Sequence, residues 1–198
     1  MNSFCKKDFI NFSLQHQGNI KDPQPLNPAN LIIIAGRPGM GKTSLMRRFV
    51  HGVFDERYLT TLGVKIDTKT VELDGKAVKL VIWDIEGADP ADREPDSISS
   101  RMKTYLQGAD GILLVADGTR PGTLEVARQI GGAFATEYGD IPIVLLLNKS
   151  DLAEQWQVDE EQLKDIDGLT QCFTTSALSG ENVARTFMYL AQKIMKGA

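Results

Sequence analysis

The stretch Gly36-Arg37-Pro38-Gly39-Met40-Gly41-Lys42-Thr43 decides the fold of this chain. It matches the pattern G-x-x-x-x-G-K-[ST], a loop whose backbone N–H groups surround phosphate oxygens. The apolar run 31–35 before it predicts a buried parallel strand, and residues 44–50 after it predict a helix. A glycine-rich turn without a ligand is the alternative, but these flanks favour a phosphate-binding loop. Lys42 would then reach the terminal phosphates, and the Thr43 hydroxyl would bind Mg²⁺.

Composition limits the class of protein. A chain of 198 residues suits one domain, and 42% hydrophobic with 24% charged residues is ordinary for a globular protein. The formal net charge of −4 gives no reason to expect nucleic-acid binding. Cys5 and Cys172 are too few for a disulfide framework or a metal cluster. No apolar run approaches the ~18 residues that span a bilayer, so we expect a cytoplasmic protein.

The N-terminal residues differ from the rest. Pro23, Pro25 and Pro28 cluster there and favour an extended linker. We therefore predict a flexible N-terminal arm over residues 1–29 and one domain over residues 30–198. The arm is either disordered or docks on the domain or on a partner, and the sequence leaves both open.

Strands and helices alternate after the first helix. Residues 63–73 alternate between apolar and polar, Asp74-Gly75 favours a tight hairpin, and residues 77–84 return as an apolar strand. A long loop is expected over residues 87–100. The remaining elements are expected as strands at 111–116, 141–147 and 171–175 and as helices near 97–106, 121–138, 159–166 and from Ser179 onward. This order predicts an α/β fold: a six-stranded, mostly parallel sheet with one antiparallel edge strand and helices on both faces.

Three further motifs follow predicted strands, at the sheet edge where such folds bind ligands. In Asp84-Ile85-Glu86-Gly87, the aspartate can hold Mg²⁺ through water, and the glycine N–H can approach a γ-phosphate. Asn148-Lys149-Ser150-Asp151 supplies a carboxylate that can accept two N–H groups of guanine, a donor pair that adenine lacks. Thr175-Ser176-Ala177 can present a backbone N–H to the guanine oxygen. Each motif alone is weak evidence. The occurrence of all of them, in this order along the chain, predicts a guanine nucleotide site.

With these motifs the chain resembles a small GTPase of the Ras superfamily, most like the Rab branch, over about residues 29–196. The resemblance implies a P-loop GTPase fold that binds GTP or GDP with Mg²⁺. It puts Phe54 beside the base, Thr61 near Mg²⁺ and the γ-phosphate, Lys149 along the base, and Asp151 on the base edge. The implied nucleotide-binding residues are Gly36, Pro38, Gly39, Met40, Gly41, Lys42, Thr43, Ser44, Phe54, Thr61, Gly87, Asn148, Lys149, Asp151, Ser176, Ala177 and Leu178. The implied metal ligands are Thr43, Thr61 and Asp84, and the implied catalytic residues are Lys42 and Thr61. Glu86 is a third catalytic candidate, which the family pattern does not imply, because its carboxylate can accept a hydrogen bond from the attacking water.

The chain also departs from the family pattern. The family's Asp-Thr-Ala-Gly-Gln reads Asp84-Ile85-Glu86-Gly87-Ala88 here, so Ala88 replaces the glutamine that orients the attacking water. Glu86 puts a carboxylate close to the phosphates and the metal. Pro38, which lacks an N–H, stands where relatives often have a small residue, and Leu178 replaces the lysine of the usual Ser-Ala-Lys. We therefore expect retained binding and slow hydrolysis.

The resemblance implies a GTP/GDP switch that recruits effector proteins through switch I (54–65) and switch II (84–105), with an exchange factor and an activating protein. The alternative is a pseudo-GTPase interaction module that holds nucleotide without cycling. A small-molecule kinase is disfavoured because Asn148–Asp151 would have no role in it. No cysteine follows the last helix, so we expect membrane contact only indirectly or through the N-terminal arm, and a cytoplasmic or peripheral membrane location.

Overall fold

The computed structural model describes residues 29–55, 61, 63–85, 106, 108–139, 141–159, 161–163 and 168–197. The strands run β1 Asn30–Ala35, β2 Val64–Leu73, β3 Lys76–Ile85, β4 Gly111–Asp117, β5 Ile143–Asn148 and β6 Leu169–Thr174. The helices run α2 Lys42–His51, α4 Gly122–Tyr138 and α5 Val183–Gly197, with short 3₁₀ turns η1 Ala153–Gln155 and η2 Glu161–Leu163.

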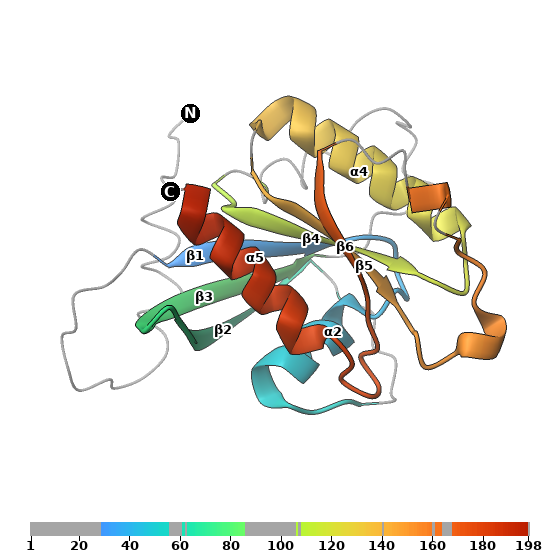
Figure 1. The fold of residues 1–198 in the computed structure, drawn as a ribbon, viewed down its shortest axis with the longest axis horizontal. Coiled ribbons are helices and arrows are strands. Elements are labelled where there is room, and N and C mark those ends of the chain that lie inside the picture. Colours follow the sequence, from blue (N-terminus) through green and yellow to red (C-terminus); the bar gives the residue numbers. More distant parts are fainter. Residues whose placement is uncertain are drawn as a thin grey trace.

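The strands form one six-stranded sheet in the order β2-β3-β1-β4-β5-β6 (Figure 1). The five neighbouring strands β3, β1, β4, β5 and β6 all pair in parallel. The edge strand β2 pairs antiparallel with β3 across the Asp74-Gly75 turn. Asp74 and Gly75 both have positive φ, as the tight turn between these strands requires. The predicted α/β fold, with one antiparallel edge strand, is confirmed.

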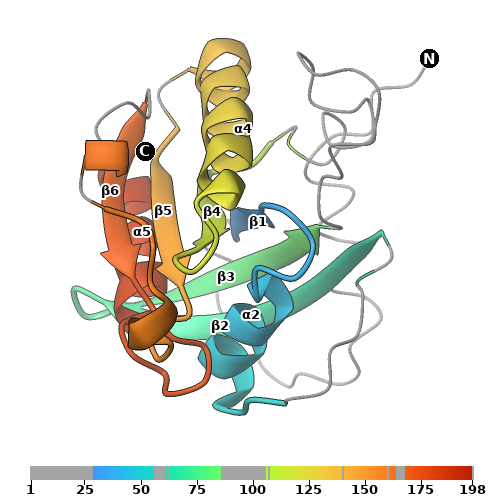
Figure 2. The same cartoon turned by 90° about the vertical axis from the view of Figure 1, so that its right-hand side faces the viewer.

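Helices cover both faces of the sheet, with α4 on one face and α2 and α5 on the other (Figure 2). Side chains of β1 alternate between the two resulting cores, because successive strand residues point to opposite faces. Leu31, Ile33 and Ala35 belong to the core under α4, whereas Ile32 and Ile34 belong to the core under α2 and α5. Since β1 is central and buried on both faces, its carboxyl end is held rigidly.

Two helices differ from the prediction. The last helix begins at Val183 instead of near Ser179, because Asn182 takes a left-handed conformation with φ of 54° that a helix cannot include. The segment predicted as a helix at 159–166 contains the 3₁₀ turn η2 among its described residues. There Asp159 and Gln162 bond to each other's backbone N–H, a local pairing that competes with a regular helix.

Several predicted features lie outside the described residues. These are the arm up to residue 28, most of switch II with Glu86, Gly87 and Ala88, and the expected helix at 97–106 apart from Leu106. The domain boundary at residues 29/30 therefore stays a prediction. Within the described part of the chain, no helix is both long enough and apolar enough to cross a membrane.

Candidate nucleotide-binding site

Polar residues gather where the parallel strands end. The phosphate-binding loop follows β1, Asp84 lies near the end of β3, and Asp117 and Asn148 close β4 and β5 as paired neighbours. The loop that begins at Thr175 follows β6. Parallel strands bring their carboxyl ends to the same edge of a sheet, so all these groups meet at one edge. Asp84, Asp117 and Asn148 are buried there, which is unusual for polar side chains that have no function or partner.

Hydrogen bonds from side chains fix the carbonyl groups of the phosphate-binding loop. The Lys42 ammonium donates to the carbonyl oxygens of Gly36 at 3.1 Å and Arg37 at 3.0 Å. The Asn148 amide donates to the carbonyl oxygen of Met40 at 2.8 Å. A loop whose carbonyls are bound in this way can turn its N–H groups toward an anion.

Gly41 permits the close approach between this loop and β5. Its φ is 89°, and a Cβ atom added there would lie 2.4 Å from Nδ2 of Asn148. No other residue type therefore fits without shifting Asn148 or straining the backbone. The helix α2 starts directly after Gly41, so the positive end of its dipole faces the same loop.

Three oxygen-bearing side chains meet between the loop and β3. Thr43 Oγ1 and Thr61 Oγ1 are 2.9 Å apart, and both hydroxyls donate to Oδ2 of Asp84, Thr61 over 3.3 Å. The second carboxylate oxygen of Asp84, Oδ1, is buried and accepts no hydrogen bond from the described residues. Burial raises the pKa of the Asp84 carboxyl above its ordinary value, although the Thr43 hydrogen bond and the Lys42 charge oppose that rise.

This oxygen cluster fits Mg²⁺. Hydroxyl and carboxylate oxygens are the ligands that Mg²⁺ prefers, and a cation beside Asp84 would satisfy the buried Oδ1 atom. Thr43, Thr61 and Asp84 would hold such an ion, which in phosphate chemistry neutralises charge on phosphate oxygens. The structure thus brings the three predicted metal ligands together, and their role as ligands stays a prediction.

The loops after β5 and β6 are joined by hydrogen bonds. The Asn148 side-chain oxygen accepts the Ala177 N–H at 3.1 Å, and the Ser176 hydroxyl donates to Oδ1 of Asp151 at 2.5 Å. Arg48 of α2 holds the second loop by donating to the carbonyl oxygens of Ala177, at 2.9 Å, and Leu178. Asp151 remains exposed, so its carboxylate is accessible to a ligand.

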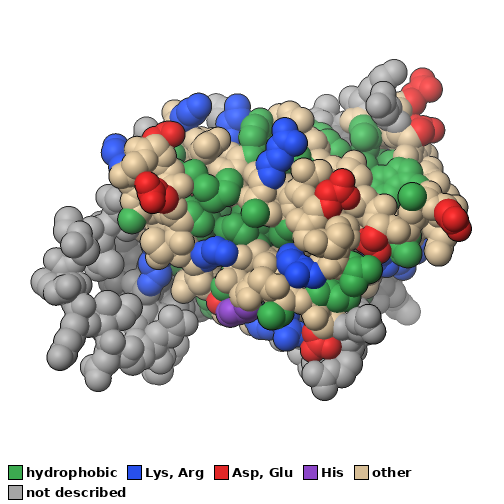
Figure 3. Space-filling model, turned by 60° about the horizontal axis from the view of Figure 1, so that its bottom comes forward, with side chains coloured by type: hydrophobic (Ala, Val, Ile, Leu, Met, Phe, Trp, Pro, Cys, Tyr) green, Lys and Arg blue, Asp and Glu red, His purple; other side chains and the backbone are tan. Residues whose placement is uncertain are grey.

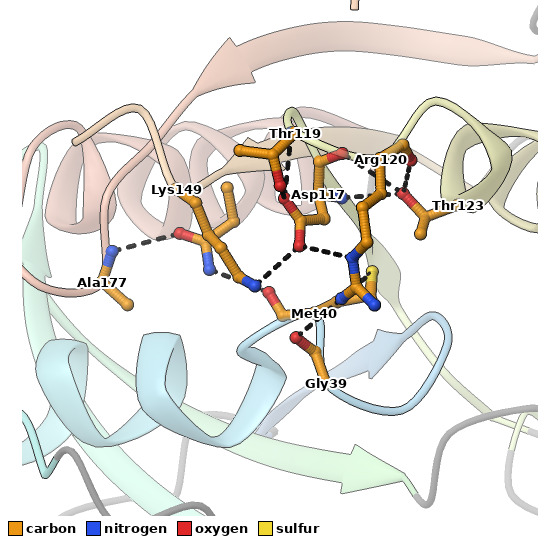
Figure 4. Close-up of polar contacts among 9 residues, drawn as sticks. Gly39, Met40, Asp117, Thr119, Arg120, Thr123, Lys149 and Ala177 are labelled. Atoms are coloured by element: carbon orange, nitrogen blue, oxygen red, sulfur yellow. Dashed lines mark hydrogen bonds and ion pairs between the residues drawn. The ribbon is translucent and has the colours of Figure 1, made fainter. Parts of the chain in front are cut away.

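Asp117 is a site residue that the sequence reasoning missed. Its carboxylate is fully buried, with Oδ2 2.7 Å from the Lys149 ammonium and 2.9 Å from Nε of Arg120 (Figure 4). Its other oxygen, Oδ1, accepts the N–H and the hydroxyl of Thr119. Burial raises the pKa of Asp117, but the hydrogen bonds from Lys149, Thr119 and Arg120 outweigh it and hold the pKa below its ordinary value. Asp117 is therefore an anion that fixes the Lys149 side chain.

The other predicted binding residues lie as follows. Ser44 lies half-buried in the first turn of α2, Pro38 is exposed in the phosphate-binding loop, and Phe54 packs half-buried against the core under α2 and α5. Leu178 is 46% exposed. Gly87 and the catalytic candidate Glu86 lie outside the described residues, so their positions stay predictions.

Comparisons with known proteins agree with this architecture. A model of the Ras family matches residues 31–196. The human Ras-related protein Rab-8B is 32% identical over 167 residues, which span 83% of this chain and 77% of that protein. The Rab-8B protein of Pongo abelii matches equally well. Ras-related protein Rab-8 of Diplobatis ommata is 33% identical over 167 residues, spanning 83% of this chain and 76% of the relative.

Proposed function

Since this chain belongs to the Ras family and is a Rab-like small GTPase, we propose that it is a Mg²⁺-dependent GTP/GDP switch with slow intrinsic hydrolysis. Family membership supports guanine nucleotide binding and GTPase activity in general terms. The finer statement, that binding is retained while hydrolysis is slow, is our own. It follows because the chain has the motifs that bind nucleotide, whereas the motif that places the attacking water differs from the family pattern.

One observation supports the switch most directly. Thr61, in the predicted switch I, lies with Thr43 and the buried Asp84 in one oxygen cluster. A ligand set that includes a switch residue forms only when that segment approaches the phosphate-binding loop. Mg²⁺ and a γ-phosphate would favour this approach, so the nucleotide state would control the position of switch I.

The proposed slow hydrolysis rests on the segment after Asp84. Phosphoryl transfer of this kind depends mainly on placing the attacking water and neutralising charge. Ala88 has no hydrogen-bonding group in its side chain, so it can do neither. Glu86 can accept a hydrogen bond from water, but its negative charge opposes the charge that develops on the phosphate.

A pseudo-GTPase that holds nucleotide without cycling is the second candidate. The same two residues favour it, because they alter hydrolysis and leave the predicted binding residues in place. It differs from the switch in one measurable respect: its partner binding would not depend on which nucleotide is bound.

The proposed partners are effector proteins that contact switch I (54–65) and switch II (84–105), an exchange factor and an activating protein. The edge strand β2 begins inside switch I, and its Ile66 is 36% exposed. Figure 3 shows basic side chains dispersed among hydrophobic ones on one face of the molecule. A mixed surface of this kind is ordinary for a protein exterior, so the proposed partners rest on family membership. Membrane contact would come through a partner or the N-terminal arm.

The test is to measure affinities of the purified full chain for GTP, GDP and ATP, with and without Mg²⁺, and its single-turnover GTP hydrolysis. We expect tight GTP and GDP binding that weakens without Mg²⁺, no competition by ATP, and slow hydrolysis. Thr43→Ala removes one proposed metal ligand and is expected to lose most of the Mg²⁺ dependence. Equal affinity for ATP and GTP would contradict the proposal, and Mg²⁺-independent binding would contradict the metal site.

A further inference from the structure

Arg120 connects two parts of the site that come from different strands. It lies in the loop between β4 and α4, and its Nε donates to Asp117 at 2.9 Å. The Nη2 group of the same guanidinium donates to the carbonyl oxygen of Gly39 in the phosphate-binding loop at 3.3 Å, and it lies 4.0 Å from the sulfur of Met40 (Figure 4). One side chain therefore joins the buried carboxylate to the loop.

The contact with Gly39 affects the direction of a neighbouring N–H group. The described peptide bonds are all trans, and in a trans peptide the C=O and the N–H point in opposite directions. Arg120 holds the Gly39 carbonyl toward β4, so the N–H of Met40 points away from β4. Asn148 acts in the same way on the next peptide: it binds the Met40 carbonyl and so directs the N–H of Gly41.

We propose that Arg120 is a positioning residue that holds the phosphate-binding loop in the shape that binds phosphate, and that it thereby slows the release of bound nucleotide. This rests on the guanine nucleotide binding proposed above. Arg120 contacts the loop through a backbone carbonyl, so its effect on the nucleotide passes through the N–H of Met40.

The anchor of Arg120 is rigid. Asp117 is fully buried and is held by Lys149 and Thr119 as well as by Arg120. The planar guanidinium keeps Nε and Nη2 in a fixed geometry, so fixing Nε on Asp117 also fixes the direction in which Nη2 points. A lysine has one ammonium on a flexible stem and cannot hold both partners in this way.

Tight packing behind Asp117 fixes the carboxylate in turn. The N–H of Gly118 donates to the Asn148 carbonyl at 3.0 Å, and the Gly118 carbonyl accepts the Gln157 N–H at 2.9 Å. A Cβ atom added at Gly118 would lie 2.1 Å from the Trp156 ring. The loop after β4 is thus held between β5 and the 156–158 segment, and it offers Arg120 a stationary partner.

The charges of Asp117, Lys149 and Arg120 together also suit an anionic ligand. The single carboxylate of Asp117 lies against two cations, Lys149 and Arg120, which leaves one positive charge in excess beside the loop. The Arg120 side chain is 51% exposed, so solvent screens its charge and we expect a moderate effect.

The test measures the release of a fluorescent GDP from full-length protein after addition of excess unlabelled GDP. The variants are Arg120→Ala and Arg120→Lys, with Arg185→Ala as the control. Arg185 is an exposed arginine of α5 that lies over the Phe173 ring. Two further measurements are the unfolding temperature of the nucleotide-free protein and competition by GMP, which lacks the β-phosphate.

We expect Arg120→Ala to release GDP about three- to tenfold faster than wild type, as loss of one partly exposed charged hydrogen bond implies. Arg120→Lys should also be faster, Arg185→Ala should match wild type, and GMP competition should stay unchanged. The unfolding temperature of Arg120→Ala should fall only slightly, because Lys149 still pairs with the buried Asp117. A wild-type rate in either Arg120 variant would overturn the proposal. So would a parallel loss of GDP binding, GMP binding and thermal stability, which indicates a general structural role. A wild type that retains no fluorescent GDP would instead refute the proposed function itself, together with this inference.

Discussion

The proposed guanine end and the γ-phosphate end of the site differ in how much of their chemistry the chain keeps. At the guanine end, Asn148 joins the loop after β6 to the phosphate-binding loop, and Lys149 is fixed by the buried Asp117. At the γ-phosphate end, Thr43, Thr61 and Asp84 meet, but the sequence that follows has Glu86 and Ala88 at the positions where the family resemblance predicts alanine and glutamine. Holding a nucleotide and hydrolysing it depend only in part on the same residues, so a chain can keep the first ability while weakening the second.

The largest expected effect tests the guanine end alone. Asp151→Asn should weaken GTP binding by about 10²–10³-fold, because an N–H donor of guanine would lose its carboxylate acceptor. Xanthosine nucleotides should bind better to the variant, since an amide N–H can donate to their additional carbonyl. Competition with a fluorescent guanine nucleotide measures both affinities.

Glu154→Gln is the matched control, because Glu154 is an exposed acid on the nearby turn η1 and its loss changes the net charge equally. It should leave the affinities unchanged. The hydrolysis rate of nucleotide already bound should also stay the same in Asp151→Asn. An unaltered preference for GTP over xanthosine triphosphate in this variant would remove Asp151 from base recognition.

Asp117→Asn tests whether a buried anion supports the guanine end. It should lower the free energy of unfolding of the nucleotide-free protein by about 2–4 kcal/mol near neutral pH, because Lys149 and Arg120 lose their shared partner. The folded-state pKa of Asp117 lies below its ordinary value, so its stabilisation is present above the unfolded pKa and is lost as pH falls through the folded pKa. The difference between wild type and variant should therefore shrink below about pH 4.

Urea unfolding at a series of pH values measures this difference. Asp110→Asn is the control, since Asp110 lies just before β4, at the opposite end of the strand, and accepts the Leu31 N–H at 2.7 Å. That variant should not accelerate GDP release, whereas Asp117→Asn should. Equal release rates in the two variants would show that Asp117 only stabilises the fold.

The sequence predicted the parts of the site that are contiguous motifs. The phosphate-binding loop and Asn148–Asp151 are each recognisable because one short segment contains all their functional groups. Asp117 was missed because Asp117-Gly118-Thr119 is typical of an ordinary turn, and its function depends on pairing with β5 and on Lys149. Arg48 was missed for the same reason, since its carbonyl partner at Ala177 is remote in sequence.

The fold was predictable because the periodicity of apolar residues specifies buried strands well. The residues at which helices begin and end were less predictable. Ser179 and Glu181 are favourable residues for a helix start, yet α5 begins only at Val183. Bonds within the turn determine this: the Ser179 N–H donates to the Ser176 hydroxyl, and the Asn182 amide donates to the Thr174 carbonyl. Such bonds depend on where β6 ends, which local propensity does not specify.

A smaller effect is expected at the γ-phosphate end. Ala88→Gln should accelerate single-turnover GTP hydrolysis about tenfold, because an amide can orient the attacking water. The gain should be clearest in the Glu86→Ala background, where the opposing negative charge is absent. GDP affinity should not change, which keeps the two ends separable. Rapid hydrolysis by the wild type that disappears in Glu86→Ala would mean that Glu86 is the catalytic residue.

The smallest expected effect returns to the guanine end, at Leu178. Leu178→Lys introduces the lysine that the family resemblance predicts after Ser176-Ala177, and it should slow GDP release about twofold. The gain is small because Leu178 is 46% exposed and its backbone is already held by Arg48, so the new side chain adds only a solvent-screened contact. Stability should change by less than about 0.5 kcal/mol, because an exposed leucine contributes little to the core. Met195→Lys, at a 39% exposed position of α5, controls for the added charge and should leave release unchanged. If Leu178→Lys and Met195→Lys slow GDP release equally, the effect comes from the added positive charge in general. A lysine at position 178 would then make no specific contact with the nucleotide.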